Sequence, residues 1–392
     1  MGAEVVIIGG GLEGLSVAWA LTRRGVTDIV VFERATVGSG FTAKSSGIVR
    51  SHYGVPSVAA MAWRSLPVLE EAASVLGADI GFHRSGYLVV VGADNVEPLE
   101  VNVTMQQGLG IEVALVGPSD VGELFPAMRI DDCAAFAYEP RGGYADAYQT
   151  AQAFSQAARR GGARLRQGTA VAKVTEAGGR VTGVALASGE EVASDTVIVA
   201  AGPWSPALVA PLGVDLPILT QREQVMIVDP GRSLGPVPVV SDLVSLQYLR
   251  PEQHHLLLGN SDHHAPEWSD PDRYVNTLDD DHAETAIEKF VHRFPTLGDA
   301  GLSSAYAGCY DVTPDYNPVI GPAPLPGLFL CAGFSGHGFK ISPAVGDLMA
   351  DIICTGASTD PVIPAAAFRF DRFATGDLLL SAHPYAGAGE MR

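Results

Sequence analysis

The sequence has few cysteines and few positive charges, and both shortages narrow the function. Four cysteines occur in 392 residues, at Cys133, Cys309, Cys331 and Cys354, and no two of them form a CxxC pair. That is too few for a secreted disulfide scaffold and fits a reduced cytosol, so we expect a cytoplasmic protein. The 25 Lys and Arg residues face 44 Asp and Glu residues, a formal net charge of −19. Because this field repels polyanions, we do not expect a nucleic-acid partner.

Long apolar runs are also missing. No uninterrupted apolar stretch approaches the ~18 residues that a membrane-spanning helix needs, so we expect no membrane span. The chain runs into an apolar strand without a preceding basic segment, so we expect no signal peptide. Hydrophobic residues make up 47% and charged residues 18%, which is typical of a globular protein. At about 100–200 residues per domain, the length indicates two or three domains, or two with interleaved segments.

The first part of the chain predicts a βαβ unit. Residues 3–8 predict a buried strand, residues 16–24 have the apolar spacing of a helix, and residues 28–34 form a second apolar strand that ends in an acid. Gly9, Gly11 and Gly14 lie between the first strand and the helix in the pattern GxGxxG. In this motif the glycines permit a tight turn, close approach of a pyrophosphate and close helix–strand packing.

An acid follows at the distance that a dinucleotide site requires. Glu33 ends the second strand, 19 residues after Gly14, where a carboxylate accepts hydrogen bonds from ribose hydroxyls. A GxGxxG alone is a weak signal, but strand, helix, spacing and acid agree here, so we predict a bound dinucleotide. The motif does not distinguish FAD from NAD.

The remaining pattern predicts an α/β fold with a discontinuous Rossmann-like domain and a second, α+β domain with a mostly antiparallel sheet. Alternating segments over 163–202, with glycine turns, end in the apolar run VIVA, which fits a parallel strand returning to the first sheet. Residues 327–333 predict a buried strand and residues 340–356 a helix. We therefore assign residues 1–80, 141–214 and 301–392 to the Rossmann-like domain, and residues 81–140 and 215–300 to the second.

Three distant segments carry further signals: KSSGIVR (44–50), AAGPWS (200–205) and GFSGHGFK (333–340), the last with TPDYNPVIGP (313–322) before it. Together they resemble the FAD-dependent amine oxidoreductases of the D-amino-acid oxidase fold, above all the β subunit of sarcosine oxidase and related proline and N-methyl-amino-acid dehydrogenases. The resemblance covers nearly the whole chain. It implies that the Rossmann-like domain binds FAD and the second domain binds substrate.

The resemblance also implies a substrate site. In sarcosine oxidases an Arg after the second strand and the Lys that ends GHGFK bind the substrate carboxylate, and the matching residues are Arg50 and Lys340. A pocket Tyr three residues before TPD matches Tyr310, and a second corresponds more loosely to Tyr248. A guanidinium fork and an ammonium suit a carboxylate. The implied reaction is oxidation of a small secondary or N-methylated amino acid to an imine, by hydride transfer to flavin N5.

The same resemblance implies the cofactor contacts. The expected FAD-binding residues are Gly9, Gly11, Gly14, Glu33, Arg34, Lys44, Ser45, Ser46, Val171, Ala201, Gly202, Trp204, Gly333, Gly336, His337, Gly338, Phe339 and Lys340. Relatives that attach FAD covalently carry a Cys where this chain has Gly308, or a His near Lys44. We therefore predict non-covalent FAD.

The electron acceptor stays open. Leu257 falls at or near the position of the Lys that promotes reaction with O₂ in monomeric sarcosine oxidase, so O₂ or a partner subunit could take the electrons. One alternative is a flavin subunit of a heteromeric dehydrogenase complex. An NAD-dependent dehydrogenase is a weaker alternative because it leaves GFSGHGFK unexplained, and the charge disfavours a tRNA-modifying flavoprotein. Four histidines at 254, 255, 263 and 264 lack a convergent ligand pattern, so we predict no metal site.

Overall fold

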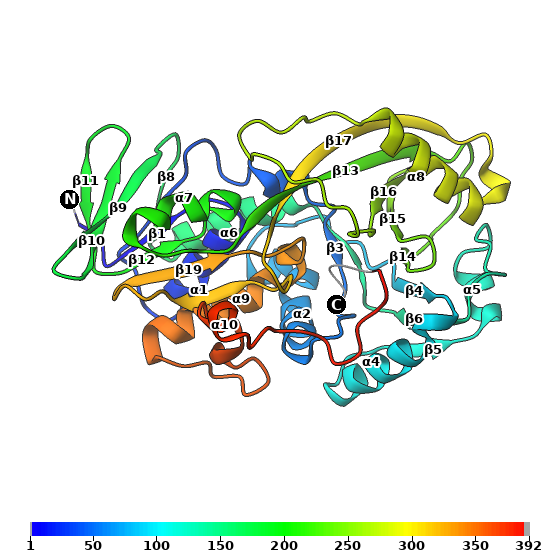
Figure 1. Cartoon of the computed structure of the whole chain (residues 1–392), viewed down its shortest axis with the longest axis horizontal. Helices are drawn as coiled ribbons and strands as arrows, with labels where there is room; N and C mark the ends of the chain where they lie inside the picture. The colour runs from blue at the N-terminus through cyan, green and yellow to red at the C-terminus, as the bar shows by residue number, and fades with distance from the viewer. Residues whose placement is uncertain (1, 388–392) are drawn as a thin grey trace.

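The molecule is built on two large sheets that lie side by side (Figure 1). The computed structural model describes residues 2–387. The first sheet has six strands in the order β18 (Val319–Pro322), β19 (Leu328–Ala332), β12 (Val197–Val199), β1 (Val5–Ile8), β2 (Ile29–Phe32) and β8 (Arg164–Arg166). All neighbouring pairs are parallel except β18 and β19. The predicted return of the chain to β1 is confirmed, because β12 pairs with β1 in parallel register, Val6 opposite Val197.

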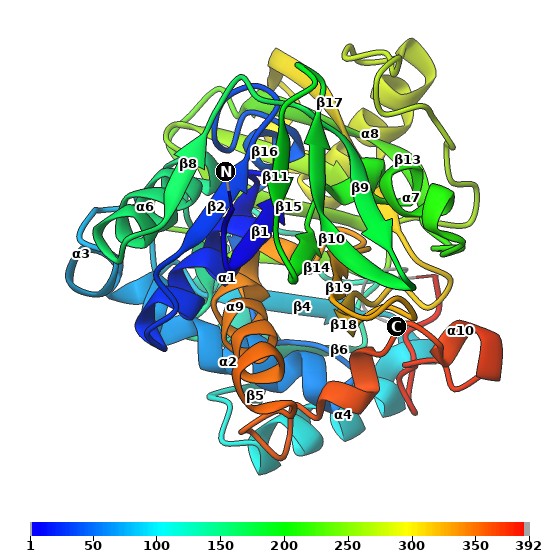
Figure 2. The same cartoon turned by 90° about the vertical axis from the view of Figure 1, so that its left-hand side faces the viewer.

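Two different layers cover this sheet. One face packs on the helices α1 (Leu12–Arg23), α6 (Ala147–Arg160) and α9 (Gly338–Thr355), with α1 against both α6 and α9, and α2 (Pro56–Glu70) packs on α9. The other face packs on the three-stranded sheet of β9 (Val171–Ala177), β10 (Arg180–Leu186) and β11 (Glu191–Ala193) and on α7 (Ser205–Val209). Figure 2 shows the three-stranded sheet toward the viewer. The parallel strands read as uniformly apolar because both of their faces are buried.

The second sheet has eight strands and is mostly antiparallel. Its order is β17 (Gly301–Val312), β13 (Leu219–Asp229), β16 (His255–Asn260), β15 (Gln247–Glu252), β14 (Val239–Asp242), β4 (Tyr87–Val91), β6 (Ala135–Glu139) and β5 (Ala114–Val116). Only β14 and β4 pair in parallel. Along each strand the side chains alternate between two faces. One set, which includes Leu88, Met226 and Leu258, packs on α8 (Asp280–Arg293), and the other set faces the six-stranded sheet's domain.

Shorter elements complete the chain. They are β3 (Ile48–Val49), β7 (Gly143–Tyr144), α3 (Ala72–Val75), α4 (Val96–Gly108), α5 (Pro118–Leu124), α10 (Arg372–Thr375) and the 3-10 helices η1 (Phe41–Lys44), η2 (Ala93–Asn95), η3 (Gly202–Trp204), η4 (Ala210–Leu212), η5 (Pro295–Leu297) and η6 (Ala365–Phe368). Within residues 2–387, no helix combines the length and the apolar character that a membrane crossing requires.

The predicted fold class is confirmed: a Rossmann-like α/β part joins an α+β part with a mostly antiparallel sheet. The division into domains stays a prediction. The long strand β17 runs along β13 and curves over the top of the molecule in Figure 1, so the larger sheet includes residues 301–312, which we assigned to the Rossmann-like domain. A boundary after residue 312 follows the hydrogen bonding of the sheet better than one after residue 300.

The C-terminal segment is tied back across both sheets. Arg372 is fully buried and donates to both oxygens of Asp315, at 2.7 and 2.9 Å. The Leu379 amide also donates to Asp315, at 2.9 Å. Farther on, Tyr385 is buried and its hydroxyl lies 2.8 Å from Nε2 of His52. These contacts carry the segment from the six-stranded sheet to the neighbourhood of Arg50.

Candidate active site

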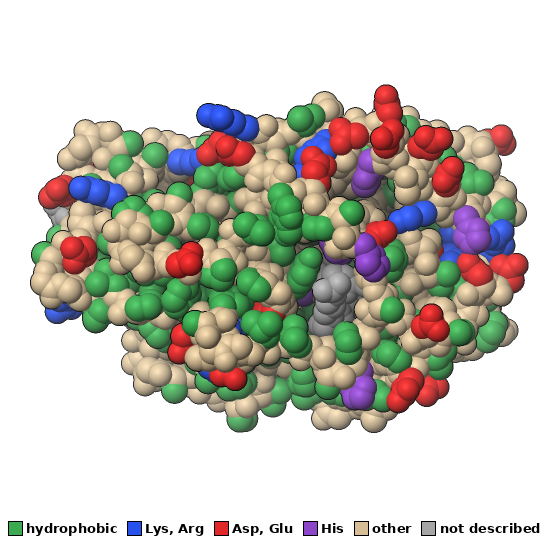
Figure 3. All heavy atoms as spheres, in the orientation of Figure 1, with side chains coloured by type: hydrophobic (Ala, Val, Ile, Leu, Met, Phe, Trp, Pro, Cys, Tyr) green, Lys and Arg blue, Asp and Glu red, His purple; other side chains and the backbone are tan. Residues whose placement is uncertain are grey.

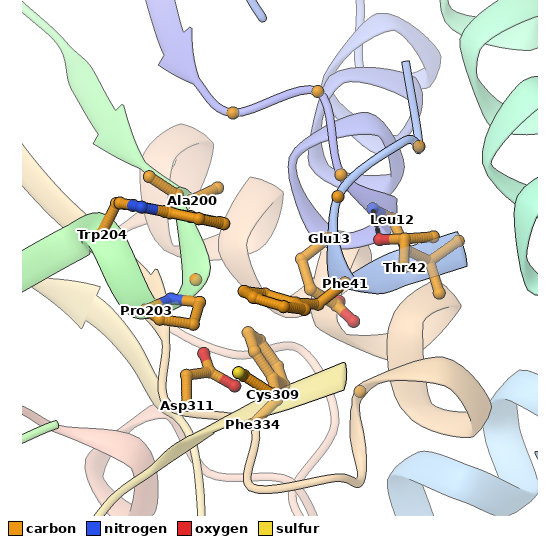
Figure 4. Close-up of a pocket in the computed structure, with 18 of the residues that line it drawn as sticks. Leu12, Glu13, Phe41, Thr42, Ala200, Pro203, Trp204, Cys309, Asp311 and Phe334 are labelled. Atoms are coloured by element: carbon orange, nitrogen blue, oxygen red, sulfur yellow. Dashed lines mark hydrogen bonds between the residues drawn. The ribbon is translucent and has the colours of Figure 1, made fainter. Parts of the chain in front are cut away.

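A cavity of about 590 Å³ opens where the two large sheets meet. Its wall includes the turn after β1, the end of β2, the loop around η1, η3, and residues of β13, β15 and β17. In Figure 4 the side chains of Phe41, Trp204 and Phe334 converge with Asp311 and Cys309 around the cavity. Its volume lies within the ~300–1,000 Å³ range that is usual for cofactor sites.

Two helix N-termini point at this cavity. Helix α1 follows Gly11 and helix α9 follows His337, and neither has a side-chain cap. Residues 11–13 at the start of α1 and Gly336, Gly338 and Phe339 at the start of α9 line the cavity. The first amides of a helix lack intrahelical acceptors and favour an anion. A long ligand with negative charge at two places fits this arrangement.

Gly9 shows why the turn needs glycine. Its φ is +115°, and a Cβ there would lie 2.2 Å from the carbonyl oxygen of Ala200. Gly14 serves packing, because a Cβ would lie 2.2 Å from the Gly9 oxygen. Glu33 accepts from the amides of Gly10, at 2.9 Å, and Ala35, at 2.7 Å, which holds its carboxylate at the end of β2 beside the cavity.

Most of the predicted cofactor residues line the cavity. They are Gly9, Gly11, Glu33, Arg34, Lys44, Ser45, Ser46, Val171, Ala201, Gly202, Trp204, Gly336, Gly338 and Phe339. Gly14, Gly333 and His337 lie outside this wall, and Lys340 lines a second cavity instead. Gly333 donates its amide to Asp311, at 2.7 Å, and the His337 ring packs on Tyr53 at a centroid distance of 5.1 Å. These two contacts fix the Gly-rich loop to β17 and to Tyr53.

Sequence reasoning missed several residues of the wall. Phe41 stacks on Trp204, with ring centroids 5.2 Å apart, and Thr42 accepts from the Leu12 amide at 3.2 Å. Glu13 and Asp311 place two carboxyls in the same wall. Burial raises the pKa of Glu13 well above its usual value and that of Asp311 to about 6, although backbone amides, that of Gly333 among them, oppose the shift at Asp311. An acid inside the glycine motif was the available signal for Glu13.

A second, small cavity of about 30 Å³ adjoins the first. All four predicted substrate residues line it: Arg50, Lys340, Tyr310 and Tyr248. Ser46, Tyr248, Tyr310 and Gly336 line both cavities and form their common rim. Residues that are 290 positions apart in sequence therefore share one recess, and their roles in it remain predictions.

Arg50 is buried and held from several sides. Its guanidinium donates to the His52 carbonyl oxygen and lies over the Tyr53 ring, 4.0 Å from the centroid. Glu139 lies nearby and accepts from the Ser51 amide at 2.8 Å. Burial raises the pKa of Glu139 to about 7, against the opposite influence of the amides and of Arg50. Burial and the Arg50 charge lower the pKa of His52 to about 3, so His52 is neutral at physiological pH.

The Gly-rich loop brings Lys340 and Tyr310 together. Lys340 is buried in the first turn of α9, and its Nζ lies 3.3 Å from the carbonyl oxygen of Gly336. A Cβ at Gly336 would lie 2.8 Å from the Tyr310 ring, so glycine there leaves room for the ring. Gly259 does the same for Tyr248, where a Cβ would lie 2.1 Å from the ring.

Ile48 also lines the small cavity, which is completed by three residues that were not predicted: Tyr87, Ser241 and Ser261. Each is a single polar or aromatic residue on or beside a strand of the larger sheet, in no motif, so the sequence held no local signal for them. Within residues 2–387, no group of three or more His, Cys, Asp or Glu side chains is arranged to hold a metal ion. Leu257 is buried in the core and lies outside the walls of both cavities.

The walls fit a bound dinucleotide. Trp204 Nε1 and Glu13 Oε2 are buried without hydrogen-bond partners among the described residues, and both residues line the large cavity. Gly308 packs on Lys44, because a Cβ at Gly308 would lie 2.8 Å from the Lys44 Cβ. Burial raises the pKa of the Cys309 thiol to about 12, which disfavours the reactive thiolate. These features support the prediction of non-covalent attachment.

Comparison with known proteins agrees with this geometry. A family model described as FAD dependent oxidoreductase matches residues 4–352. Mitochondrial dimethylglycine dehydrogenase of Mus musculus is 25% identical over 95% of this chain, but the chain spans only 45% of that protein's length. Sarcosine oxidase subunit beta of Rhodobacter capsulatus is 25% identical, with 96% of this chain and 90% of that one covered. The crystal structure of L-proline dehydrogenase from P. horikoshii superposes with a TM-score of 0.88 and 27% identity, covering 96% and 99%.

Fold and site together define a dinucleotide-dependent redox protein. The chain belongs to the family of FAD-dependent oxidoreductases. The resemblance seen in the sequence is confirmed, as is FAD as the cofactor, and NAD is thereby set aside.

Proposed function

We propose that the protein oxidises a small secondary or N-methylated amino acid at its CH–NH bond, giving an imine that water then hydrolyses. The observation that carries this proposal is the small cavity, where Arg50 and Lys340 lie together on the far side of a rim shared with the cofactor cavity. FAD, when bound, would supply the acceptor for the hydride that leaves the substrate carbon, and a cationic amine must first lose its proton so that the nitrogen lone pair can form the C=N bond. The family membership and the names of the relatives support the reaction class.

The chain's own residues bind and orient the substrate. Arg50 can hold both oxygens of a carboxylate, and Lys340 adds a point charge. In a protein of net charge −19, two buried cations in one recess form a local anion site. The cavity volume of about 30 Å³ admits little more than the carboxylate group, so the rest of the substrate extends over the rim toward the larger cavity. Tyr248 and Tyr310 border that path and shape it.

The test is anaerobic mixing of the FAD-loaded protein with sarcosine, dimethylglycine, proline, hydroxyproline and N-methyl-aminobutyrate while flavin bleaching is followed. At least one of these amines is expected to bleach the flavin. Arg50→Ala and Lys340→Ala are each expected to raise the half-saturating substrate concentration tenfold or more, since hydrogen bonds to charged groups contribute about 1.5–3 kcal/mol.

Arg64→Ala and Lys173→Ala are matched controls. Arg64 pairs with Asp360 at a partly exposed site, and Lys173 is exposed on β9. Both controls are expected to leave the half-saturating concentration unchanged. Wild-type kinetics in Arg50→Ala and Lys340→Ala would refute the carboxylate site.

A second candidate is that the protein is the flavin subunit of a complex that passes electrons to a partner. The name of the Rhodobacter relative, a subunit beta, favours it. The two candidates differ in reoxidation: an oxidase consumes O₂ at the rate of amine turnover, whereas a dehydrogenase subunit turns over only with an added dye or quinone.

A further inference from the structure

We propose that Glu223 binds the cationic amine of the substrate, so that the site recognises both charges of a zwitterion. The inference rests on the proposed function, in which Arg50 and Lys340 bind the substrate carboxylate, and it names the residue that binds the amine of the same molecule. Glu223 lies on β13, is buried, and lines the cofactor cavity together with Tyr248 and Tyr310 of the common rim.

The sheet register places Glu223 on the face that looks at the substrate site. Glu223 lies opposite Gly308 on β17, and Gln221 lies opposite Tyr310. On the other side, Val225 pairs with Gly259, which in turn pairs with Tyr248. Because side chains two residues apart share a face, Glu223 lies on the same face as Tyr310 and Tyr248.

The distribution of charge in the two cavities favours an acidic residue near their common rim. Among the described residues that line the small cavity, the charged ones are Arg50 and Lys340, and none is acidic. Since that cavity holds little more than a carboxylate, the amine of a short amino acid lies at or beyond the rim. An ammonium group that leaves water there needs a counter-charge, because an unpaired buried charge is costly.

The other acids of the large cavity lie elsewhere. Glu33 accepts from the Gly10 and Ala35 amides at the end of β2. Asp311 accepts from the Gly333 amide, and Glu13 belongs to helix α1. Of the four acids among the described residues of this wall, Glu223 is the one on the same face of the larger sheet as Tyr248.

Neighbouring side chains orient the Glu223 carboxylate. Gln221 Nε2 donates to Glu223 Oε1 at 2.5 Å, and His263 Nδ1 lies 3.7 Å from the same oxygen. His263 also contacts Gln221, at 3.0 Å between Nδ1 and Nε2. All three residues are buried, so the carboxylate is preorganised rather than mobile in solvent. The substrate class that follows is a small amino acid with a positively charged amine and a short spacer to its carboxylate.

The experiment compares two ligands that differ at one atom. Sarcosine carries both charges, whereas methylthioacetate replaces the amine nitrogen with sulfur and keeps only the carboxylate. FAD-loaded wild type, Glu223→Gln and the control Glu176→Gln, an exposed acid on β9, are titrated with each. The readouts are the flavin spectral change with methylthioacetate and the half-saturating concentration for bleaching with sarcosine, or with whichever amine of the panel bleaches wild type best. Glu223→Gln is expected to weaken the amine tenfold or more and methylthioacetate less than twofold.

Glu223→Gln overturns the inference if it leaves amine half-saturation within twofold, or if it weakens both ligands equally, as a merely structural role would. If Glu223→Gln fails to hold FAD, the test uses the two ligands with the wild-type protein alone. The wild-type protein must bind the amine at least tenfold more tightly than methylthioacetate, and equal binding of the two refutes the inference. The proposed function fails separately, when no amine of the panel bleaches the wild-type flavin. Amine bleaching with no effect of Glu223→Gln removes the inference alone.

Discussion

Arg50 and Glu139 are buried near each other, and the cost of that burial makes the protein sensitive to pH. Burial raises the pKa of Glu139 to about 7, above the value of about 4.5 expected in the unfolded chain. A carboxyl with a raised pKa contributes stability that is fully present below pH about 4.5. That contribution is lost as pH rises through 7.

Glu139→Gln should therefore change how stability depends on pH. The amide cannot ionise, so the variant escapes the penalty that wild type meets in neutral and alkaline solution. Between pH 5.5 and 8.5, the free energy of unfolding of wild type should fall by about 2 kcal/mol relative to the variant. Urea unfolding at both pH values measures this difference, with Glu176→Gln as the exposed control. A pH-independent difference would show that Glu139 keeps an ordinary pKa in the fold.

At the scale of elements, the turn between β1 and α1 depends on glycine for space as well as for conformation. Gly9→Ala places a Cβ 2.2 Å from the Ala200 oxygen, whereas Gly25, with φ of +88°, has no heavy atom within 4 Å of an added Cβ. Gly25→Ala should cost only the strain of a left-handed residue, about 1–2 kcal/mol. Gly9→Ala should in addition distort the turn and lower the flavin content of the purified protein at least tenfold. Flavin absorbance per protein measures the occupancy of each variant, and equal occupancy in Gly9→Ala and Gly25→Ala would contradict the steric argument.

The C-terminal segment gives a second prediction at this scale. The Tyr385 hydroxyl lies 2.8 Å from Nε2 of His52, whose carbonyl oxygen accepts from Arg50. Tyr385→Phe removes one buried hydrogen bond, worth about 0.5–1.5 kcal/mol, and loosens the support of Arg50. The dissociation constant of methylthioacetate should rise about two- to tenfold, while flavin content stays constant. The control Tyr148→Phe, at an exposed tyrosine, should change neither the dissociation constant nor the flavin content. An unchanged dissociation constant in Tyr385→Phe would show that Arg50 needs no support from Tyr385.

Single helices and strands were more predictable from the sequence than the pairing of strands with one another. The helix predicted at 340–356 is α9, and the predicted 327–333 strand contains β19, because apolar periodicity is a local property. The pairing of strands is not local: β4 pairs in parallel with β14, about 150 residues later, and no pattern in either segment indicates that neighbour. The site divides in the same way. Arg50 and Lys340 lie in recognisable motifs, whereas Tyr87, Ser241 and Glu223 meet there only through the sheet.

At the scale of the whole molecule, the charge of −19 acts on every approaching anion. Figure 3 shows acidic side chains over much of one face, including the region of α8. Raising the salt concentration from 0.05 to 0.5 M should speed association of methylthioacetate about threefold, since screening weakens the repulsion. A zwitterion such as sarcosine has no net charge, so its association should change little. Stopped-flow experiments measure the association rates of both ligands. If methylthioacetate associates more slowly at high salt, attraction by the two cavity cations outweighs repulsion by the net charge.

The order of strands in the six-stranded sheet has a consequence for the protein's synthesis. Strand β1 ends at Ile8, its neighbour β12 begins at Val197, and the next strand, β19, ends at Ala332. A ribosome that adds about 5–20 residues each second needs on the order of tens of seconds to travel that distance. During this time the apolar N-terminal strands are made but lack their later neighbours, so the nascent chain must be shielded from aggregation until its last third emerges.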